Sequence, residues 1–258
     1  MEDLHVSFIQ TQLFWEDPQK NRTHFEAKLA NLAPTDLVLL PEMFSTGFSM
    51  HPEPLAEPTN GPSLQWMQKM ATQYQFALCG SLIIQEKQKY YNRLYFVYPD
   101  GQYTHYDKKH LFSLAGEQHK YSPGRALNII TYKGWRICPL ICYDLRFRVW
   151  WRNQDEAYDL LLYVANWPAR RTYAWDQLLK ARAIENMSYV VGVNRIGQDA
   201  NKNQYLGHSI ICDMLGQALT PEKLEKDTSQ GVLLNKEALQ KARKKLGFLR
   251  DADSFTLY

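Results

Sequence analysis

Short, continuous apolar runs are the feature that most restricts how this chain can fold. Leu160 to Ala165 and Tyr189 to Asn194 are almost entirely apolar. Runs of this length are typical of strands buried on both faces. Thr172 to Asn186 lies between them and has the character of a helix. Because strands and helices alternate along the whole chain, we predict an α/β fold, and the many predicted strands relative to the few long helices favour two sheets over one.

No linker, shift in composition or internal repeat divides the chain. Its 258 residues can form one α/β domain. Hydrophobic residues make up 45% and charged residues 22%, which is usual for a globular protein. We therefore predict a single domain over residues 1–258.

Composition restricts the partners and the compartment. A net charge of +3 is too small to favour nucleic acid or an anionic membrane as a partner. No apolar run is long enough to span a bilayer, and Met1 to Asp3 lacks the basic start of a signal peptide. The spacing of Cys138 and Cys142 fits no zinc motif. We predict a cytoplasmic protein with reduced thiols and no metal.

Cys142 stands at the end of one apolar run. Trp135 to Ile141 is prone to form a strand, and a helix up to about Glu156 is expected after the cysteine. A thiol presented at such a turn can act as a nucleophile, and the backbone N–H of Tyr143 can stabilise an oxyanion. The alternative is a small buried residue at a strand end, since free cysteine is among the most buried residue types.

Two other buried runs also end in polar residues, Glu42 and Asn166. Sites in α/β folds form outside the carboxyl ends of strands, so these side chains can converge with Cys142. Lys108 and Lys109 lie between a predicted strand and an apolar pair. A thiol that attacks a carbonyl needs a base and a cation, which glutamate and lysine supply. Solvated side chains are the alternative for both residue types.

Three segments in this order resemble the nitrilase, or carbon–nitrogen hydrolase, superfamily: LLPEMF from Leu39, YDKKHLF from Tyr106 and LICYDLRF from Leu140. The resemblance extends over nearly the whole chain and includes NWP at 166–168 and ARAIENMSYVVGVNR at 181–195. It implies a four-layer α-β-β-α sandwich of two mixed sheets flanked by helices. It also implies that no cofactor is needed.

The same resemblance implies roles for particular residues. Glu42 would be the base, Lys108 the oxyanion cation and Cys142 the nucleophile that forms a thioester. The family pattern Lys-any-His-Leu selects Lys108 over Lys109. Glu117 matches the place of a second, supporting glutamate that orients Lys108.

PEMFSTGFSM at 41–50, CYDLRFRVWWRN at 142–153 and YVANWPARR at 163–171 are most similar to the bacterial omega-amidase branch. This branch releases ammonia from the terminal amide of 2-oxo dicarboxylic acid monoamides, such as 2-oxoglutaramate and 2-oxosuccinamate, and is linked to methionine salvage. Such a small-molecule substrate carries a carboxylate, for which Arg170 and Arg171 are candidate partners. Phe112 and Trp167 are candidate apolar walls. Surface or core positions are the alternatives for these residues.

Other activities and an assembly remain open. An aliphatic nitrilase, an N-carbamoyl-amino-acid hydrolase and an acyltransferase would use the same residues, while a non-catalytic scaffold or a thiol redox sensor would not hydrolyse amides. The resemblance implies a homodimer or higher homo-oligomer, in which Trp150 and Trp151 lie at the interface or in the core. The charged residues Asp144, Arg146, Arg182 and Glu185 are expected to form structural pairs.

Overall fold

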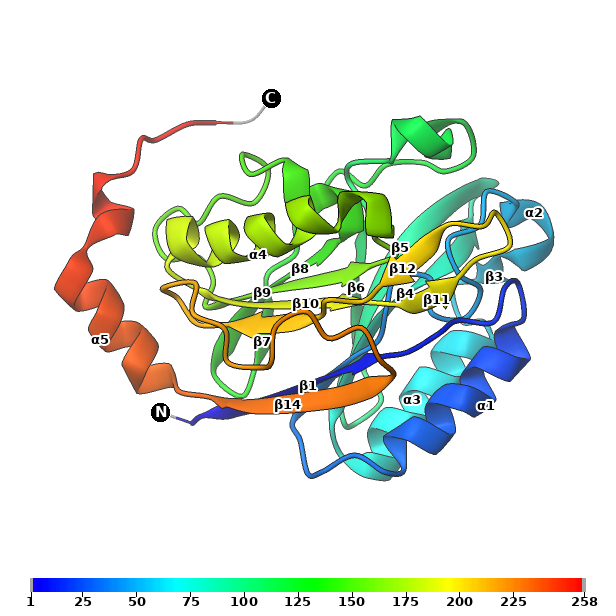
Figure 1. Cartoon of the computed structure of the whole chain (residues 1–258), viewed down its shortest axis with the longest axis horizontal. Helices are drawn as coiled ribbons and strands as arrows, with labels where there is room; N and C mark the ends of the chain where they lie inside the picture. The colour runs from blue at the N-terminus through cyan, green and yellow to red at the C-terminus, as the bar shows by residue number, and fades with distance from the viewer. Residues whose placement is uncertain (1, 257–258) are drawn as a thin grey trace.

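Two large sheets lie face to face, with helices on their outer sides (Figure 1). The computed structural model describes residues 2–256, so Met1, Leu257 and Tyr258 of the predicted 1–258 domain lie outside the described residues. Helices α1 (Pro18–Leu29) and α3 (Pro62–Tyr74) cover one sheet, and α4 (Thr172–Asn186) covers the other. The predicted four-layer α/β sandwich is therefore confirmed.

The first sheet has seven strands in the order β14-β1-β2-β4-β5-β6, with β3 beside β4. Strands β1, β2 and β4 are parallel to one another, whereas β5, β6 and β14 pair antiparallel with their neighbours. The sheet is therefore mixed. Its strands are β1 (Leu4–Gln10), β2 (Leu37–Leu39), β3 (Glu57–Pro58), β4 (Ala77–Glu86), β5 (Lys89–Val97), β6 (Tyr103–Asp107) and β14 (Thr228–Leu234).

The second sheet has five strands in the order β13-β10-β9-β8-β7. Its three central strands are parallel, so their carboxyl ends lie at one edge. These are β8 (Trp135–Ile141), β9 (Leu160–Ala165) and β10 (Tyr189–Asn194), which have the bounds that their apolar runs predict. The outer strands are β7 (Ile130–Tyr132) and β13 (Ile210–Cys212), and β11 (Ile196–Gln198) pairs with β12 (Gln204–Leu206) in a separate ribbon.

The remaining elements are short, apart from one helix near the C-terminus. They comprise α2 (Pro52–Leu55), α5 (Lys236–Leu246) and the 3-10 helices η1 (Ser113–Ala115), η2 (Glu117–His119), η3 (Cys142–Arg146), η4 (Ala169–Arg171) and η5 (Phe248–Asp251). Within residues 2–256, no helix is both long and apolar enough to cross a membrane.

The central strands of both sheets are apolar on both faces. Leu37 and Leu39 contribute to the core between the sheets, and Val38 packs in the core under α1 and α3. On the second sheet, α4 approaches β10 closely at Gly192, where an added Cβ would lie 2.6 Å from Leu179 Cδ1. The continuous apolar runs of these strands follow from this layering, in which each sheet lies between the other sheet and a helix.

The prediction of a helix from Cys142 to about Glu156 is wrong, since only the short η3 forms. In the rest of this segment, side chains form hydrogen bonds with the backbone. Trp151 Nε1 donates to the Asp144 carbonyl at 3.0 Å, and Tyr158 Oη donates to the Trp151 carbonyl at 2.7 Å. Asn153 Nδ2 donates to the Tyr158 carbonyl at 3.1 Å. These bonds satisfy the backbone without helical turns, and Trp151 is fully buried in the core.

Two local features complete the fold. Residues 217–219 follow a turn and contact β13 through one isolated bridge between Cys212 and Ala218. Gly61 precedes α3, and the hydroxyl of Ser63 in its first turn donates to Glu57 Oε1 at 2.6 Å.

Asp159 joins the start of β9 to α5. Its buried carboxylate accepts hydrogen bonds from Lys236 Nζ, from Arg243 Nη1 at 3.0 Å and from Arg136 Nη2 at 3.1 Å. Burial by itself raises the pKa of Asp159, but the bonds from Arg136 and Lys236 outweigh it, so the pKa lies below its usual value. The folded structure therefore favours the ionised carboxylate.

Replacing Asp159→Asn should lower the thermal midpoint by roughly 10 °C at pH 7, since it leaves buried cations without their counter-charge. Because the pKa is lower in the folded state, the stabilisation is present above about pH 4 and is lost as the pH falls through the folded value. The difference in thermal midpoint between the variant and the wild type should therefore become smaller below about pH 4. Glu237→Gln, which removes an exposed pair with Lys241, is the control and should change little. A difference in thermal midpoint that does not change with pH would contradict the role of the ionised Asp159.

Candidate active site

Cys142 begins η3 directly after β8, in a left-handed backbone conformation with φ of +42°. Such a conformation is uncommon for a residue other than glycine and persists only where the surroundings enforce it. Cys142 is half-buried and lines a pocket, whereas Cys79, Cys138 and Cys212 are buried. The turn therefore directs this thiol away from the core.

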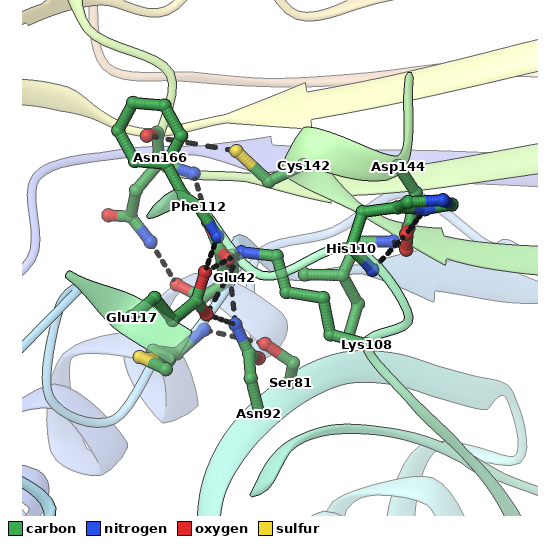
Figure 2. Close-up of polar contacts among 12 residues, drawn as sticks. Glu42, Ser81, Asn92, Lys108, His110, Phe112, Glu117, Cys142, Asp144 and Asn166 are labelled. Carbon is green, nitrogen blue, oxygen red and sulfur yellow. Dashed lines mark hydrogen bonds and ion pairs between the residues drawn. The ribbon is translucent and has the colours of Figure 1, made fainter. Parts of the chain in front are cut away.

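Asp144 holds the turn that carries Cys142 (Figure 2). Its carboxylate accepts the Ile141 N–H at 3.1 Å and the Tyr106 hydroxyl at 2.9 Å. It also accepts the His110 N–H at 3.0 Å, and His110 Nδ1 lies 2.8 Å from the same oxygen. Asp144 is thus paired, as predicted, but with His110 and Tyr106 rather than Arg146. These bonds tie the turn to β6 and to the segment that follows it.

Glu42 follows β2 and is fully buried. The N–H groups of Met43 and Phe44 donate to the Ser81 hydroxyl and carbonyl, which fixes this turn against β4. Glu42 Oε2 accepts the backbone N–H of Asn166 at 2.8 Å. Because Asn166 follows β9, this bond joins the carboxyl ends of strands from the two different sheets.

Lys108 follows β6 and reaches the same place. Its Nζ lies 2.9 Å from Glu42 Oε1 and 2.9 Å from Glu117 Oε2. The Lys108 carbonyl accepts the N–H of Gly124 at 2.9 Å, where an added Cβ would lie only 2.0 Å from the Asp107 carbonyl oxygen. The segment between β6 and Gly124 therefore packs tightly around the lysine.

Glu117, in η2, completes this buried group. Its Oε2 also accepts the N–H of Phe112 at 2.5 Å, so the carboxylate is held by its own loop as well as by Lys108. Glu42, Lys108 and Glu117 are each at most 1% exposed. The structure thus brings the four predicted residues together, with Cys142 against the pocket (Figure 2).

Burial and charge together determine the protonation of this group. Burial alone lowers the pKa of Lys108, but Glu117 and Glu42 outweigh it and raise the pKa, so the amine stays protonated. Burial raises the pKa of Glu117, against the opposing effect of Lys108. Burial and the neighbouring Glu42 raise the pKa of the Cys142 thiol well above its usual value. The resting thiol is therefore neutral and needs a base to become a nucleophile.

The pocket beside Cys142 has a volume of about 340 Å³. Phe112, Trp167 and Arg171, the three residues predicted to bind substrate, all line it. The Arg171 guanidinium lies over the Phe112 ring, 4.9 Å from its centroid. Tyr143 also lines the pocket as the second residue of η3, where N–H groups have no partner within the helix. Its backbone can therefore donate to a bound oxyanion.

The prediction that Arg146 forms a structural pair with Asp144 is wrong. Arg146 instead lines the pocket, 4.9 Å from the Trp167 ring centroid. With Arg170 and Arg171 it forms a group of three pocket arginines, none of which makes an ion pair with any residue of 2–256. The predicted pair between Arg182 and Glu185 does form, at 3.0 Å. The pocket arginines are thus available to an anionic ligand.

Sequence reasoning missed Asn92 in β5, whose side-chain amide contacts Glu42. Period-two alternation places Asn92 on the same face as Leu94 and Phe96, which belong to the core between the sheets. A polar residue at an inward position was the available signal. The polar pocket residues beyond β10 were also missed: Asp199, Asn201, Asn203 and Tyr205.

Comparison with known proteins agrees with this fold. The pattern of the Carbon-nitrogen hydrolase family matches residues 5–243. The chain is 41% identical over 257 residues to Omega-amidase YafV from Yersinia enterocolitica, covering all of both chains. It is 31% identical over 219 residues to 2-oxoglutaramate amidase from Bacillus subtilis, covering 83% of this chain and 84% of the relative.

A solved structure is similar over its whole length. XC1258 from Xanthomonas campestris, a CN-hydrolase superfamily protein with an arsenic adduct in its active site, has a TM-score of 0.97 and 41% identity, and each chain covers 100% of the other. Family pattern, full-length identity and fold agree with the resemblance found in the sequence motifs. The chain belongs to the carbon–nitrogen hydrolase family and is an enzyme of that family.

Proposed function

We propose that this enzyme hydrolyses the terminal amide of 2-oxo dicarboxylic acid monoamides, such as 2-oxoglutaramate and 2-oxosuccinamate. The observation that carries the proposal is the pocket itself, which has the buried Glu42–Lys108–Glu117 group and Cys142 at one place and three arginines elsewhere on its walls. The first group suits attack on an amide, and the arginines suit a carboxylate. The relatives named omega-amidase and 2-oxoglutaramate amidase support this substrate class.

The first half of the proposed reaction forms a thioester. Glu42 takes the proton of the Cys142 thiol as the sulfur attacks the amide carbonyl, since the raised thiol pKa disfavours a free thiolate. The Lys108 ammonium and the N–H of Tyr143 stabilise the oxyanion. As the intermediate collapses, the C–N bond breaks, Glu42 returns its proton to the leaving nitrogen, and ammonia departs.

The second half releases the acid. Glu42 takes a proton from a water molecule that attacks the thioester carbonyl, and a second oxyanion forms against Lys108 and Tyr143. The C–S bond then breaks, and the sulfur recovers a proton from Glu42. One water is consumed for each amide, and the enzyme returns to its initial state.

Glu117 and Lys108 have different tasks from Glu42. With its pKa raised, Lys108 stays an ammonium and cannot serve as the base, so it acts as an electrostatic catalyst. Glu117 contacts Lys108 through both carboxylate oxygens, at 3.1 and 2.9 Å, and orients it. Glu42 also accepts the backbone N–H of Asn166, and the carbonyl of Asn166 lies 3.9 Å from the Cys142 sulfur. Glu42 is therefore the glutamate that is linked to the thiol.

Arg171 is proposed to bind the substrate carboxylate. Its guanidinium faces the Phe112 ring, and burial lowers its pKa, as does the nearby Arg170. A bound carboxylate would relieve this crowding of positive charge. Phe112 and Trp167 then form the apolar walls along the carbon chain of the substrate.

A substrate panel tests the proposal. The purified enzyme should turn over 2-oxoglutaramate with a kcat/KM at least about 10- to 100-fold above that for butyramide, because the charged contact is worth about that factor. A simple aliphatic nitrile and an N-carbamoyl amino acid should be poorer still. Best turnover of the nitrile or of the carbamoyl compound would replace this proposal with a nitrilase or an N-carbamoyl-amino-acid hydrolase.

The same panel tests Arg171. Arg171→Met should lose most of the preference for 2-oxoglutaramate through a raised KM and leave butyramide turnover nearly unchanged. Arg148→Met is the matched control, since Arg148 pairs loosely with Glu185 outside this pocket. If both variants keep the wild-type preference, Arg171 does not bind the carboxylate.

The two adjacent lysines offer a second test. Lys108→Met should lower kcat by about 100- to 1,000-fold or more, since it removes an oxyanion donor and leaves two buried carboxylates without a cation. Lys109→Met should retain nearly full activity, because Lys109 Nζ lies over the Trp150 ring outside the buried group. Circular dichroism would establish that both variants fold. Equal losses in the two variants would contradict the assignment of Lys108.

A further inference from the structure

Asn92 is a fully buried polar residue that contacts three parts of the site. Its Nδ2 donates to Glu42 Oε1 at 2.8 Å and approaches Glu117 Oε1 at 3.4 Å. Its backbone carbonyl accepts the N–H of Lys108 at 3.0 Å. Figure 2 shows the amide directed at the carboxylates from the β5 side of the group.

The orientation of this amide follows from its surroundings. A flipped amide would place Oδ1 against carboxylate oxygens, so the nitrogen must face Glu42 and Glu117. In the observed orientation Asn92 Oδ1 is buried and has no hydrogen-bond partner among residues 2–256. An unpaired buried acceptor is unfavourable, and the neighbours on the same face, Leu94 and Phe96, are apolar. The stability of β5 therefore does not explain an asparagine here, whereas a task for its nitrogen does.

The two oxygens of Glu42 are held unequally. Oε1 accepts both the Lys108 ammonium at 2.9 Å and Asn92 Nδ2 at 2.8 Å. Oε2 accepts the backbone N–H of Asn166 at 2.8 Å. Since a carboxylate oxygen has two lone pairs, Oε1 is saturated, while Oε2 keeps a position for one more proton donor.

We propose that Asn92 is a positioning residue for the base. Together with Lys108 it occupies Glu42 Oε1, so that Oε2 is the atom that takes the thiol proton and later returns it. Its amide also stabilises the ionised form of Glu42 in the resting enzyme. This inference rests on the role of Glu42 in the proposed function, but it does not depend on which amide is the substrate.

The groups around Glu42 restrict what a pH profile can report. Lys108 faces it from the end of β6, Glu117 from η2 and Cys142 from η3. The phenols of Tyr121 and Tyr205 also interact with Glu42, but burial raises their pKa values above the usual value, so both stay neutral. The acid limb of a profile for thiol reactivity therefore belongs to the buried group as a whole and not to one residue.

The test measures alkylation of Cys142 by iodoacetamide against pH, with tandem mass spectrometry to separate Cys142 from Cys138. In Asn92→Leu, the midpoint of the acid limb should move to higher pH by about one unit, because the ionised carboxylate loses a donor. Asn92→Val, which also lacks a donor and suits a strand, should show the same shift if the leucine variant does not fold. Because alkylation needs no substrate, this experiment tests the role of Asn92 even if the enzyme does not hydrolyse 2-oxoglutaramate.

Asn153→Leu is the matched control. Asn153 is an equally buried asparagine that donates to two backbone carbonyls, those of Tyr158 and Asn186, away from the pocket. Its loss should lower the thermal midpoint and leave the midpoint of the alkylation profile unchanged. A folded Asn92 variant with the wild-type alkylation profile, or an Asn153 variant with the same shift, would overturn the proposal.

Discussion

The ammonium of Lys108 between two buried carboxylates is the interaction on which the site depends. Glu42 and Glu117 come from different elements, and two carboxyl groups buried this close together need a cation between them. The ammonium in turn stays charged because both carboxylates face it. Removing Lys108 leaves two buried carboxylates without a cation, and removing either glutamate takes away one of the two groups that hold the ammonium, so we regard the three as one electrostatic unit. That unit is placed where an oxyanion would develop beside Cys142.

The stacking of the two sheets brings this unit to the thiol. Glu42 follows a strand of the first sheet, while Cys142 and Asn166 follow parallel strands of the second. Much of this could be predicted, because the apolar runs Trp135–Ile141 and Leu160–Ala165 allow only buried strands, and polar residues at their ends belong to the same edge. The choice of Lys108 over Lys109 required the family resemblance, since two adjacent lysines cannot be distinguished by composition.

Other features depend on contacts that appear only in the folded chain. The segment after Cys142 has helical character locally, yet its backbone is satisfied by side chains such as Trp151 and Tyr158. Asn92 interrupts an apolar face, but a single polar residue in a strand does not show which group it will meet. Arg146 was expected to pair with Asp144, whose partners instead come from β6 and the loop after it. Each of these partners is distant in sequence or set by a turn, so local patterns do not reveal it.

The central claim is that Cys142 carries the acyl group during turnover. The most direct measurement is intact-protein mass spectrometry of the enzyme quenched in acid during steady-state turnover of 2-oxoglutaramate. We expect a mass increase equal to the 4-carboxy-4-oxobutanoyl group, located on Cys142 by peptide mapping and removed by neutral hydroxylamine. Turnover at the wild-type rate by Cys142→Ala, or an acyl group on any other residue, would contradict the account.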